Sequence, residues 1–106
     1  MVRINVSINN LIRQFLSRIS EQGIRIKSAY LYGSYARGTE TEWSDIDVAI
    51  VSPDISDDRL EERFRLVKTS ALIDSRIEPV PFNAKAFVDE DPLVWEIKKE
   101  GILIVL

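Results

Sequence analysis

The stretch that most constrains the fold is a short apolar run broken once, by an aspartate. Residues Ile46 to Val51 read IDVAIV, and Pro53 follows closely. An almost continuous apolar run of this length is typical of a central β-strand that is covered on both faces. Proline cannot donate a ladder hydrogen bond, so the strand should end there. We therefore expect a sheet with helices packed on it and this strand at its centre.

The other segments follow the order helix, strand, strand, helix, strand, helix, strand. A three-four apolar spacing predicts a first helix over residues 8–22, with Ser7 as its N-cap and Gly23 as its stop. The remaining predicted elements are a strand over 24–32, a helix starting at Ser56, a strand over 76–82 at a sheet edge, a helix opened by Asp91-Pro92, and a final strand over 101–106. The second helix is expected to bury an apolar side made of Leu60, Phe64, Val67 and Ala71. Together these elements predict one α/β (α+β) domain over residues 1–106, with a mixed sheet of about four strands and about three helices.

Composition removes several kinds of chemistry. The chain has 106 residues, no cysteine and no histidine, and a formal net charge of −3. Thiol catalysis, imidazole bases and the usual zinc sites are therefore excluded. No basic run interleaved with aromatic residues is present, so a general nucleic-acid surface is not expected. The first ten residues lack the apolar core of a secretory signal and no run could span a bilayer, so we expect a cytoplasmic protein.

Two aspartates stand at the start of the central strand. Asp45 and Asp47 are two residues apart, so on a strand both side chains point to the same face. Two carboxylates this close repel each other, and their removal from water is costly unless a cation compensates. Mg²⁺ prefers oxygen ligands and is commonly held by one or two carboxylates together with substrate phosphates. The pair therefore predicts a Mg²⁺ site, the alternative being a turn at Ser44-Asp45 with Asp47 hydrogen-bonded at the strand end.

The turn after the preceding strand predicts the phosphate side of this site. Gly33 lets backbone amides approach a phosphate, and the hydroxyl of Ser34 adds a donor. If residues 34–38 form a helical turn, its first amides also face the anion. Arg37 is placed to neutralise phosphate charge, or else pairs with a loop acid such as Glu40 or Glu42. The loop tryptophan, Trp43, is expected to pack over the sheet rather than to stack on a base.

A site with two metal ions generally needs a third carboxylate from a neighbouring strand. Glu78, in the segment RIEPVPF, is the best candidate, and an exposed edge-strand glutamate is the ordinary alternative. Asp74 is the second candidate for this third carboxylate, because it lies at a predicted helix end where solvated acids are common. The predicted catalytic and metal-binding residues are thus Asp45, Asp47 and Glu78.

The spacing of these residues resembles a known family. Gly33-Ser34, ten residues, and then Asp45-x-Asp47 resemble the motif of the polymerase-β-like nucleotidyltransferases. The fuller text GSYARG…SDIDVAIV resembles the small branch called minimal nucleotidyltransferases. The resemblance implies Mg²⁺-dependent transfer of a nucleoside monophosphate from ATP or another NTP to an acceptor. It implies that Gly33, Ser34 and Arg37 contact the nucleotide, that Asp45 and Asp47 bind metal, and that Glu78 is the third acid, where many relatives have aspartate.

The same resemblance implies a protein partner. The minimal branch resembles the antitoxin half of toxin–antitoxin pairs, whose partner is a small helical HEPN-family ribonuclease. A domain of this size has little surface left to enclose a second substrate, so a partner subunit or self-association is expected to complete the site. Two alternatives are a nucleotidyltransferase with a small-molecule acceptor and an antitoxin that binds its partner without turnover.

Overall fold

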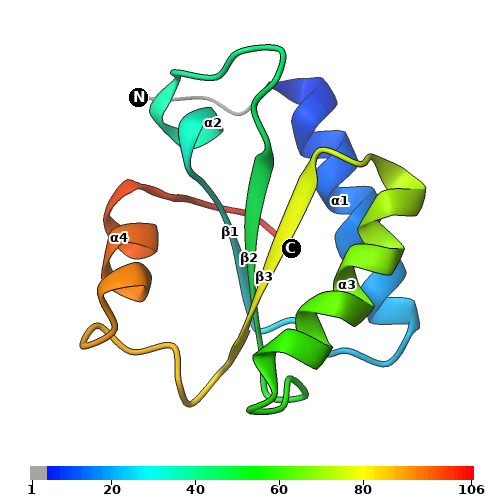
Figure 1. Ribbon diagram of the computed structural model, residues 1–106, viewed down its shortest axis with the longest axis vertical. Coiled ribbons are helices and arrows are strands. Elements are labelled where there is room, and N and C mark those ends of the chain that lie inside the picture. The colour runs from blue at the N-terminus through cyan, green and yellow to red at the C-terminus, as the bar shows by residue number, and fades with distance from the viewer. Residues whose placement is uncertain (1–4) are drawn as a thin grey trace.

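The computed structural model describes residues 5–106, so the first four residues of the segment examined for a secretory signal lie outside it. Within these described residues, four helices and four strands alternate along the chain (Figure 1). The helices are α1 (Val6–Glu21), α2 (Ser34–Arg37), α3 (Arg59–Ile73) and α4 (Pro92–Glu100). The strands are β1 (Ser28–Tyr32), β2 (Ile46–Ser52), β3 (Ile77–Asn83) and β4 (Ile102–Leu103).

The strands form one mixed sheet in the order β3-β2-β1-β4. β1 is antiparallel to β2 and to β4, whereas β2 and β3 are parallel. The predicted mixed sheet is therefore confirmed, with β2 inside it and β3 at an edge. Pro79 and Pro81 fit that position, since an edge strand has one side without ladder partners.

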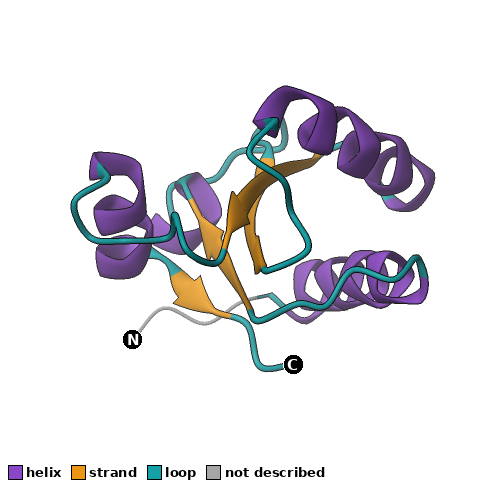
Figure 2. Cartoon of the chain, turned by 90° about the horizontal axis from the view of Figure 1, so that it is seen from below, coloured by secondary structure: helices purple, strands orange, loops and turns teal. Residues whose placement is uncertain are grey.

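Helices cover both faces of the sheet (Figure 2). On one face, α1 and α3 enclose the larger core, to which β2 contributes Ile46, Val48 and Ile50. On the other face, α4 packs through Val94 and Ile97 on a smaller core that holds the alternate β2 residues Ala49 and Val51. Because side chains alternate along a strand, Asp47 projects to the α4 face.

Several predicted boundaries were wrong. α1 begins at Val6, and its N-cap is Asn5, whose side chain accepts a hydrogen bond from Ser7 N at 2.8 Å, so Ser7 lies inside the helix. α3 begins only at Arg59, because Asp58 caps it by accepting from Glu61 N at 3.1 Å. β1 is limited to the residues that pair with β2, and β4 to two residues. The short α2 brings the number of helices in residues 5–106 to four.

The predicted buried side of α3 was also wrong. Leu60, Phe64 and Val67 are 81%, 64% and 39% exposed, and Ala71 is exposed as well. The helix instead buries Leu66, Thr69 and Ser70 against α1 and β3. The two polar side chains are tolerated there because they are hydrogen-bonded: Ser70 Oγ donates to Val67 O at 3.1 Å, and Thr69 Oγ1 accepts from Gln22 at 3.1 Å.

Membrane insertion finds no support in the helices of residues 5–106. None of them combines the length and the apolar character that a bilayer span requires.

Candidate functional site

Three polar side chains lie opposite one another across three neighbouring strands. Tyr32, the last residue of β1, pairs with Asp47 of β2, and Asp47 pairs with Glu78 of β3. Paired residues on neighbouring strands project to the same face, about 4.8 Å apart in the direction of the hydrogen bonds. We call Tyr32, Asp47 and Glu78 the polar row; it lies on the α4 face, at the end of the sheet where β2 begins.

The two aspartates flank a buried isoleucine at the start of β2. Ile46 is fully buried on the α1 face, and its amide donates to Arg76 O at 2.7 Å, which fixes the start of β2. The flanking Asp45 and Asp47 are exposed and half-buried, respectively. The pKa of Asp47 is raised above its ordinary value by burial, then by the charges of Asp45 and Glu78, and only partly lowered by Arg37. The site therefore concentrates negative charge that a cation would stabilise.

Gly33 brings the glycine–serine turn onto Asp47. Gly33 has φ 75° and ψ −151°, a conformation almost confined to glycine, and it caps the N-terminus of α2. A Cβ atom at this position would overlap Oδ2 of Asp47. Gly33 O accepts from Ala36 N and Arg37 N, both at 3.1 Å, so the predicted helical turn is present. The carboxylate of Asp47 therefore lies directly against the backbone of Gly33, the residue before Ser34.

Arg37 ends the helical turn and is half-exposed. Its Nη1 lies 3.8 Å from Oε2 of Glu100 on α4, so the alternative pairing with Glu40 or Glu42 was wrong. Its charge still lowers the pKa of Asp47, which means that it lies near the polar row. A long, exposed ion pair of this kind is weak, so the guanidinium is free to turn toward an anion.

Of the two candidates for a third acid, Glu78 lies in the polar row and Asp74 does not. Glu78 Oε2 accepts from Arg63 Nη2 of α3 at 2.8 Å, with both side chains partly exposed. Asp74 instead caps the end of α3 and binds Arg76 through both carboxylate oxygens, at 3.1 and 2.9 Å. This pairing lowers the pKa of Asp74. The carboxylate of Asp74 is therefore occupied by its neighbour Arg76, whereas Glu78 lies opposite Asp47 in the polar row.

Two residues of this site were missed at the level of the sequence. Tyr32 looks like a packing residue there, yet it stands in the row, and its pKa is raised to about 12, first by burial and then by the charge of Asp47. It therefore stays a neutral phenol that can donate a hydrogen bond. Arg63 is one of several helix arginines, and no sequence pattern links it to Glu78, 15 positions away.

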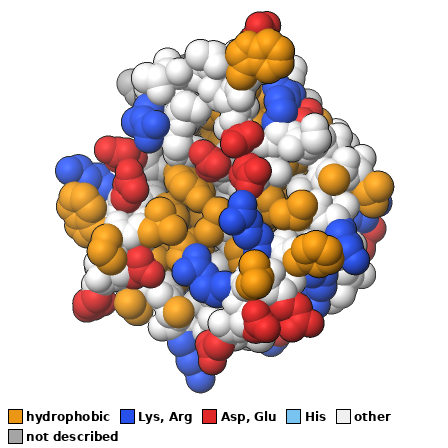
Figure 3. Space-filling model, viewed as in Figure 1, with side chains coloured by type: hydrophobic (Ala, Val, Ile, Leu, Met, Phe, Trp, Pro, Cys, Tyr) orange, Lys and Arg blue, Asp and Glu red, His pale blue; other side chains and the backbone are white. Residues whose placement is uncertain are grey.

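Hollows of moderate size flank the row. One of about 110 Å³ is lined by Tyr32, Gly33, Arg37, Glu96 and Glu100, and another of about 280 Å³ by Arg59, Leu60, Arg63, Val80 and Pro81. On the face drawn in Figure 3, acidic side chains gather near the centre with basic side chains directly below them. Trp43 is 85% exposed, so the expected packing over the sheet was wrong.

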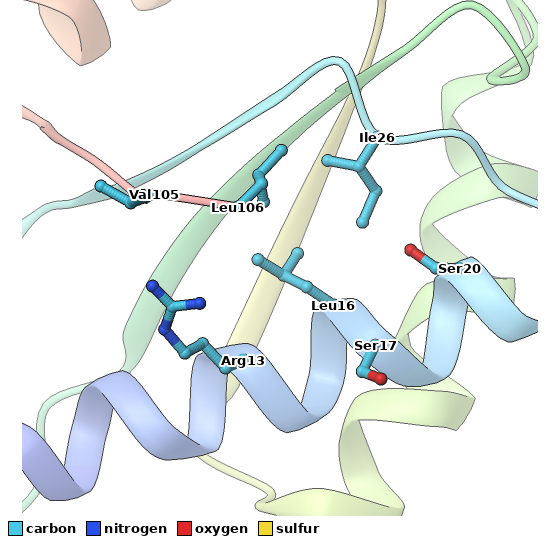
Figure 4. A pocket seen from close by; sticks show the side chains of 7 residues that line it. All are labelled: Arg13, Leu16, Ser17, Ser20, Ile26, Val105 and Leu106. Atoms are coloured by element: carbon cyan, nitrogen blue, oxygen red, sulfur yellow. The ribbon is translucent and has the colours of Figure 1, made fainter.

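A further hollow of about 270 Å³ lies away from the row, on the α1 side of the sheet. It is lined by α1 residues from Arg13 to Ser20, by Ile26 and by the last two residues, Val105 and Leu106 (Figure 4). No aspartate or glutamate side chain is among the residues that line it, so it lacks the ligand set expected for a divalent cation.

The acidic residues of the site suit Mg²⁺ in their chemistry. Asp45, Asp47 and Glu78 offer only oxygen donors, and burial together with the charges of Asp45 and Glu78 raises the pKa of Asp47, so a cation would stabilise its ionised form. As the side chains stand, no three acidic groups within residues 5–106 converge closely enough to hold an ion. Glu78 is turned to Arg63 instead, and a rotation of this partly exposed side chain would bring it to the aspartates.

A mixed sheet with this fold, and with acids resting on a glycine–serine turn, defines a nucleotidyltransferase-type domain. The chain belongs to the nucleotidyltransferase domain family, whose sequence model matches residues 11–103. This confirms the family inferred from the spacing of Gly33-Ser34 and Asp45-x-Asp47.

Relatives of this chain carry related names. It is 34% identical over 55 residues to the "Putative protein adenylyltransferase MJ1305" of Methanocaldococcus jannaschii, covering 51% of this chain and 37% of that protein. The match thus spans little more than a third of the relative. A "putative nucleotidyltransferase" from Sulfolobus solfataricus has the same fold, with a TM-score of 0.66 at 19% identity over 92% of this chain and 79% of that one. A toxin–antitoxin complex crystallised with AMP-PNP contains a chain that is 26% identical, with a TM-score of 0.66, over 92% of this chain and 72% of that one.

Proposed function

We propose that this protein is a Mg²⁺-dependent nucleotidyltransferase that moves AMP from ATP to a hydroxyl group of a partner protein. The observation that carries the proposal is the contact between Gly33 and Asp47. It joins a backbone suited to phosphates and a carboxylate suited to a metal ion at one point. Nucleotidyl transfer needs both, because the phosphates must be positioned while their charge is neutralised.

We assign the metal-binding and phosphate-binding roles to the residues around Gly33 and Asp47. Asp45 and Asp47 would hold Mg²⁺, with Glu78 as the third ligand, and the bound ion would neutralise charge on the triphosphate. The amides after Gly33 and the hydroxyl of Ser34 would hold the phosphates. Arg37 would leave its weak pairing with Glu100 and add positive charge on the same side.

The reaction is a single displacement. The acceptor oxygen attacks the α-phosphorus, the bond from that phosphorus to the bridging oxygen breaks, and pyrophosphate leaves with the bonding electrons. The hydroxyl proton needs an acceptor, and the chain has no histidine. Glu78 is suited to this task once it is released from Arg63, because it is the carboxylate nearest the open edge of the sheet.

The names of two similar proteins support a protein as the acceptor. The name of the Methanocaldococcus relative specifies protein adenylyl transfer, and the toxin–antitoxin complex was crystallised with an ATP analogue. We infer that this chain is the antitoxin of such a pair. The resemblance of its motif to the minimal branch makes a helical HEPN-family toxin the proposed acceptor.

The first test is calorimetric titration with a non-hydrolysable ATP analogue, with and without Mg²⁺. Binding should require the metal and should disappear in the Asp45→Asn/Asp47→Asn variant. Glu42→Gln, an exposed acid in the neighbouring loop, serves as the matched control and should bind like the parent. Binding that is indifferent to Mg²⁺ and to the double variant would refute the proposed carboxylate clamp.

A further inference from the structure

An apolar stripe runs along the outer side of α3. Leu60, Phe64 and Val67 are spaced three or four residues apart, so they lie on one face of the helix, and all three are exposed. We call them the α3 stripe; Ala71, also exposed, continues it by one turn. In the view of Figure 3, apolar and basic side chains alternate over α3, on the right. Exposed apolar groups that cluster in this way mark interaction surfaces.

The stripe borders the polar row. Arg59 and Arg63 lie along one side of the stripe, where Arg63 binds Glu78 at 2.8 Å and Arg59 stacks 4.7 Å from the ring centre of Phe82. Leu60 belongs to the stripe and also lines the hollow of about 280 Å³ that these arginines share with β3. A protein seated on the stripe would therefore reach the edge of the site beside Glu78.

The charges beside the stripe define what can cover it. Arg59 and Arg63 stand on one side. On the other side Lys68 lies over Phe64, with its Nζ 4.9 Å from the ring centre, and the exposed Glu61 stands two helical turns before Lys68. Glu62 faces away, because its carboxylate accepts from Ser56 N at 3.2 Å. A covering helix with acidic residues beside its own apolar stripe would meet opposite charges along the side of Arg59 and Arg63, and Lys68 together with Glu61 on the other side.

We propose that the α3 stripe is the docking surface for the acceptor protein, which binds through an amphipathic helix whose apolar stripe is flanked by Asp and Glu. This inference rests on the proposed function, because it takes the acceptor to be a protein. Docking here places the acceptor beside Glu78, and an acidic side chain of the helix pairs with Arg63 and releases Glu78 for its role.

The test uses two synthetic helical peptides of about 20 residues, a length that sustains a helix. Both carry a leucine stripe, flanked by Glu in one and by Lys in the other, and each is titrated into the isotope-labelled protein by NMR. The Glu-flanked peptide should shift the α3 amides and bind at least about tenfold more tightly than the Lys-flanked one. Phe64→Ser should abolish the binding. Leu72→Ser, at a residue 76% exposed on another side of the same helix, is the matched control and should preserve it.

Equal binding of both peptides, or binding that survives Phe64→Ser, would overturn the proposed surface. So would a dimer of the parent in sedimentation that is lost in Phe64→Ser, because a second copy would then cover the stripe. Calorimetry with Mg²⁺ and the ATP analogue separates this inference from the proposed function. Phe64→Ser should bind the nucleotide like the parent, whereas absence of nucleotide binding in every variant would refute the function and not the peptide contact.

Discussion

Replacing Asp47 by asparagine should stabilise the fold at neutral pH while it removes the metal site. Asparagine has nearly the same shape as aspartate, so Asp47→Asn changes charge more than packing. In the parent, the half-buried carboxylate lies between Asp45 and Glu78, and burial and both charges raise its pKa. The folded protein therefore disfavours the ionised form of Asp47 relative to the unfolded chain.

The size of the gain follows from the strand register. Asp47 and Glu78 are paired on neighbouring strands about 4.8 Å apart, and the turn of Glu78 toward Arg63 lengthens the distance between the carboxylates, for which we take roughly 6 Å. Two unit charges at that distance repel by about 3 kcal/mol at the effective dielectric constant of a protein surface. Solvent, Arg37 and Arg63 screen much of this repulsion, which leaves a gain of about 1 kcal/mol. For a domain of this size, that raises the melting temperature by about 4–8 °C.

The assay is thermal unfolding by circular dichroism at neutral and at acid pH, without divalent ions. Since the folded protein holds the proton of Asp47 more tightly than the unfolded chain does, its ionisation lowers stability as pH rises above the ordinary pKa of 3.8. The difference between variant and parent should thus be present at neutral pH and vanish at about pH 3. Glu42→Gln should melt like the parent at both. A variant that melts no higher than the parent at neutral pH would refute the electrostatic reasoning.

Three further predictions concern two neighbours of the site, Arg63 and Gly33, and one ion pair, Arg25–Asp54, beyond the other end of β2. Arg63→Gln should tighten Mg²⁺ binding by up to about fivefold in calorimetry, since it frees Glu78 from an exposed ion pair worth at most about 1 kcal/mol; unchanged affinity would contradict Glu78 as a ligand. Gly33→Ala should lose about 1–3 kcal/mol in urea unfolding, because alanine disfavours this backbone conformation and its methyl group displaces Asp47; parent-like stability would argue against the strained turn. Asp54→Asn should flatten the loss of stability between about pH 4 and pH 2, because hydrogen bonds from Arg25 lower the pKa of Asp54 to about 2 and protonation removes their contribution; urea unfolding across this range is the check, and an unchanged slope would refute it.

Much of the local arrangement could be predicted from the sequence because it depends on short periods. The alternation of side chains along a strand places Asp45 and Asp47 on one face and Ile46 on the other. A glycine at the strand end predicts the tight turn into Ser34. The apolar run over β2 predicts a strand covered on both sides, as α1 and α4 cover it. Each of these inferences needs only neighbours within a few residues.

Tertiary structure alone decided which distant groups meet. The register of β2 against β3 sets Glu78, and not Asp74, opposite Asp47, and the position of α3 brings Arg63 to that carboxylate. The apolar spacing in α3 identifies a stripe but not the direction in which it faces. The opposite side can be buried because the hydroxyls of Ser70 and Thr69 are hydrogen-bonded there. Ser70 finds one partner, Val67 O, in its own helix, but its second partner, Ile77 O, and the Gln22 partner of Thr69 come within reach only once α1, α3 and β3 are packed together.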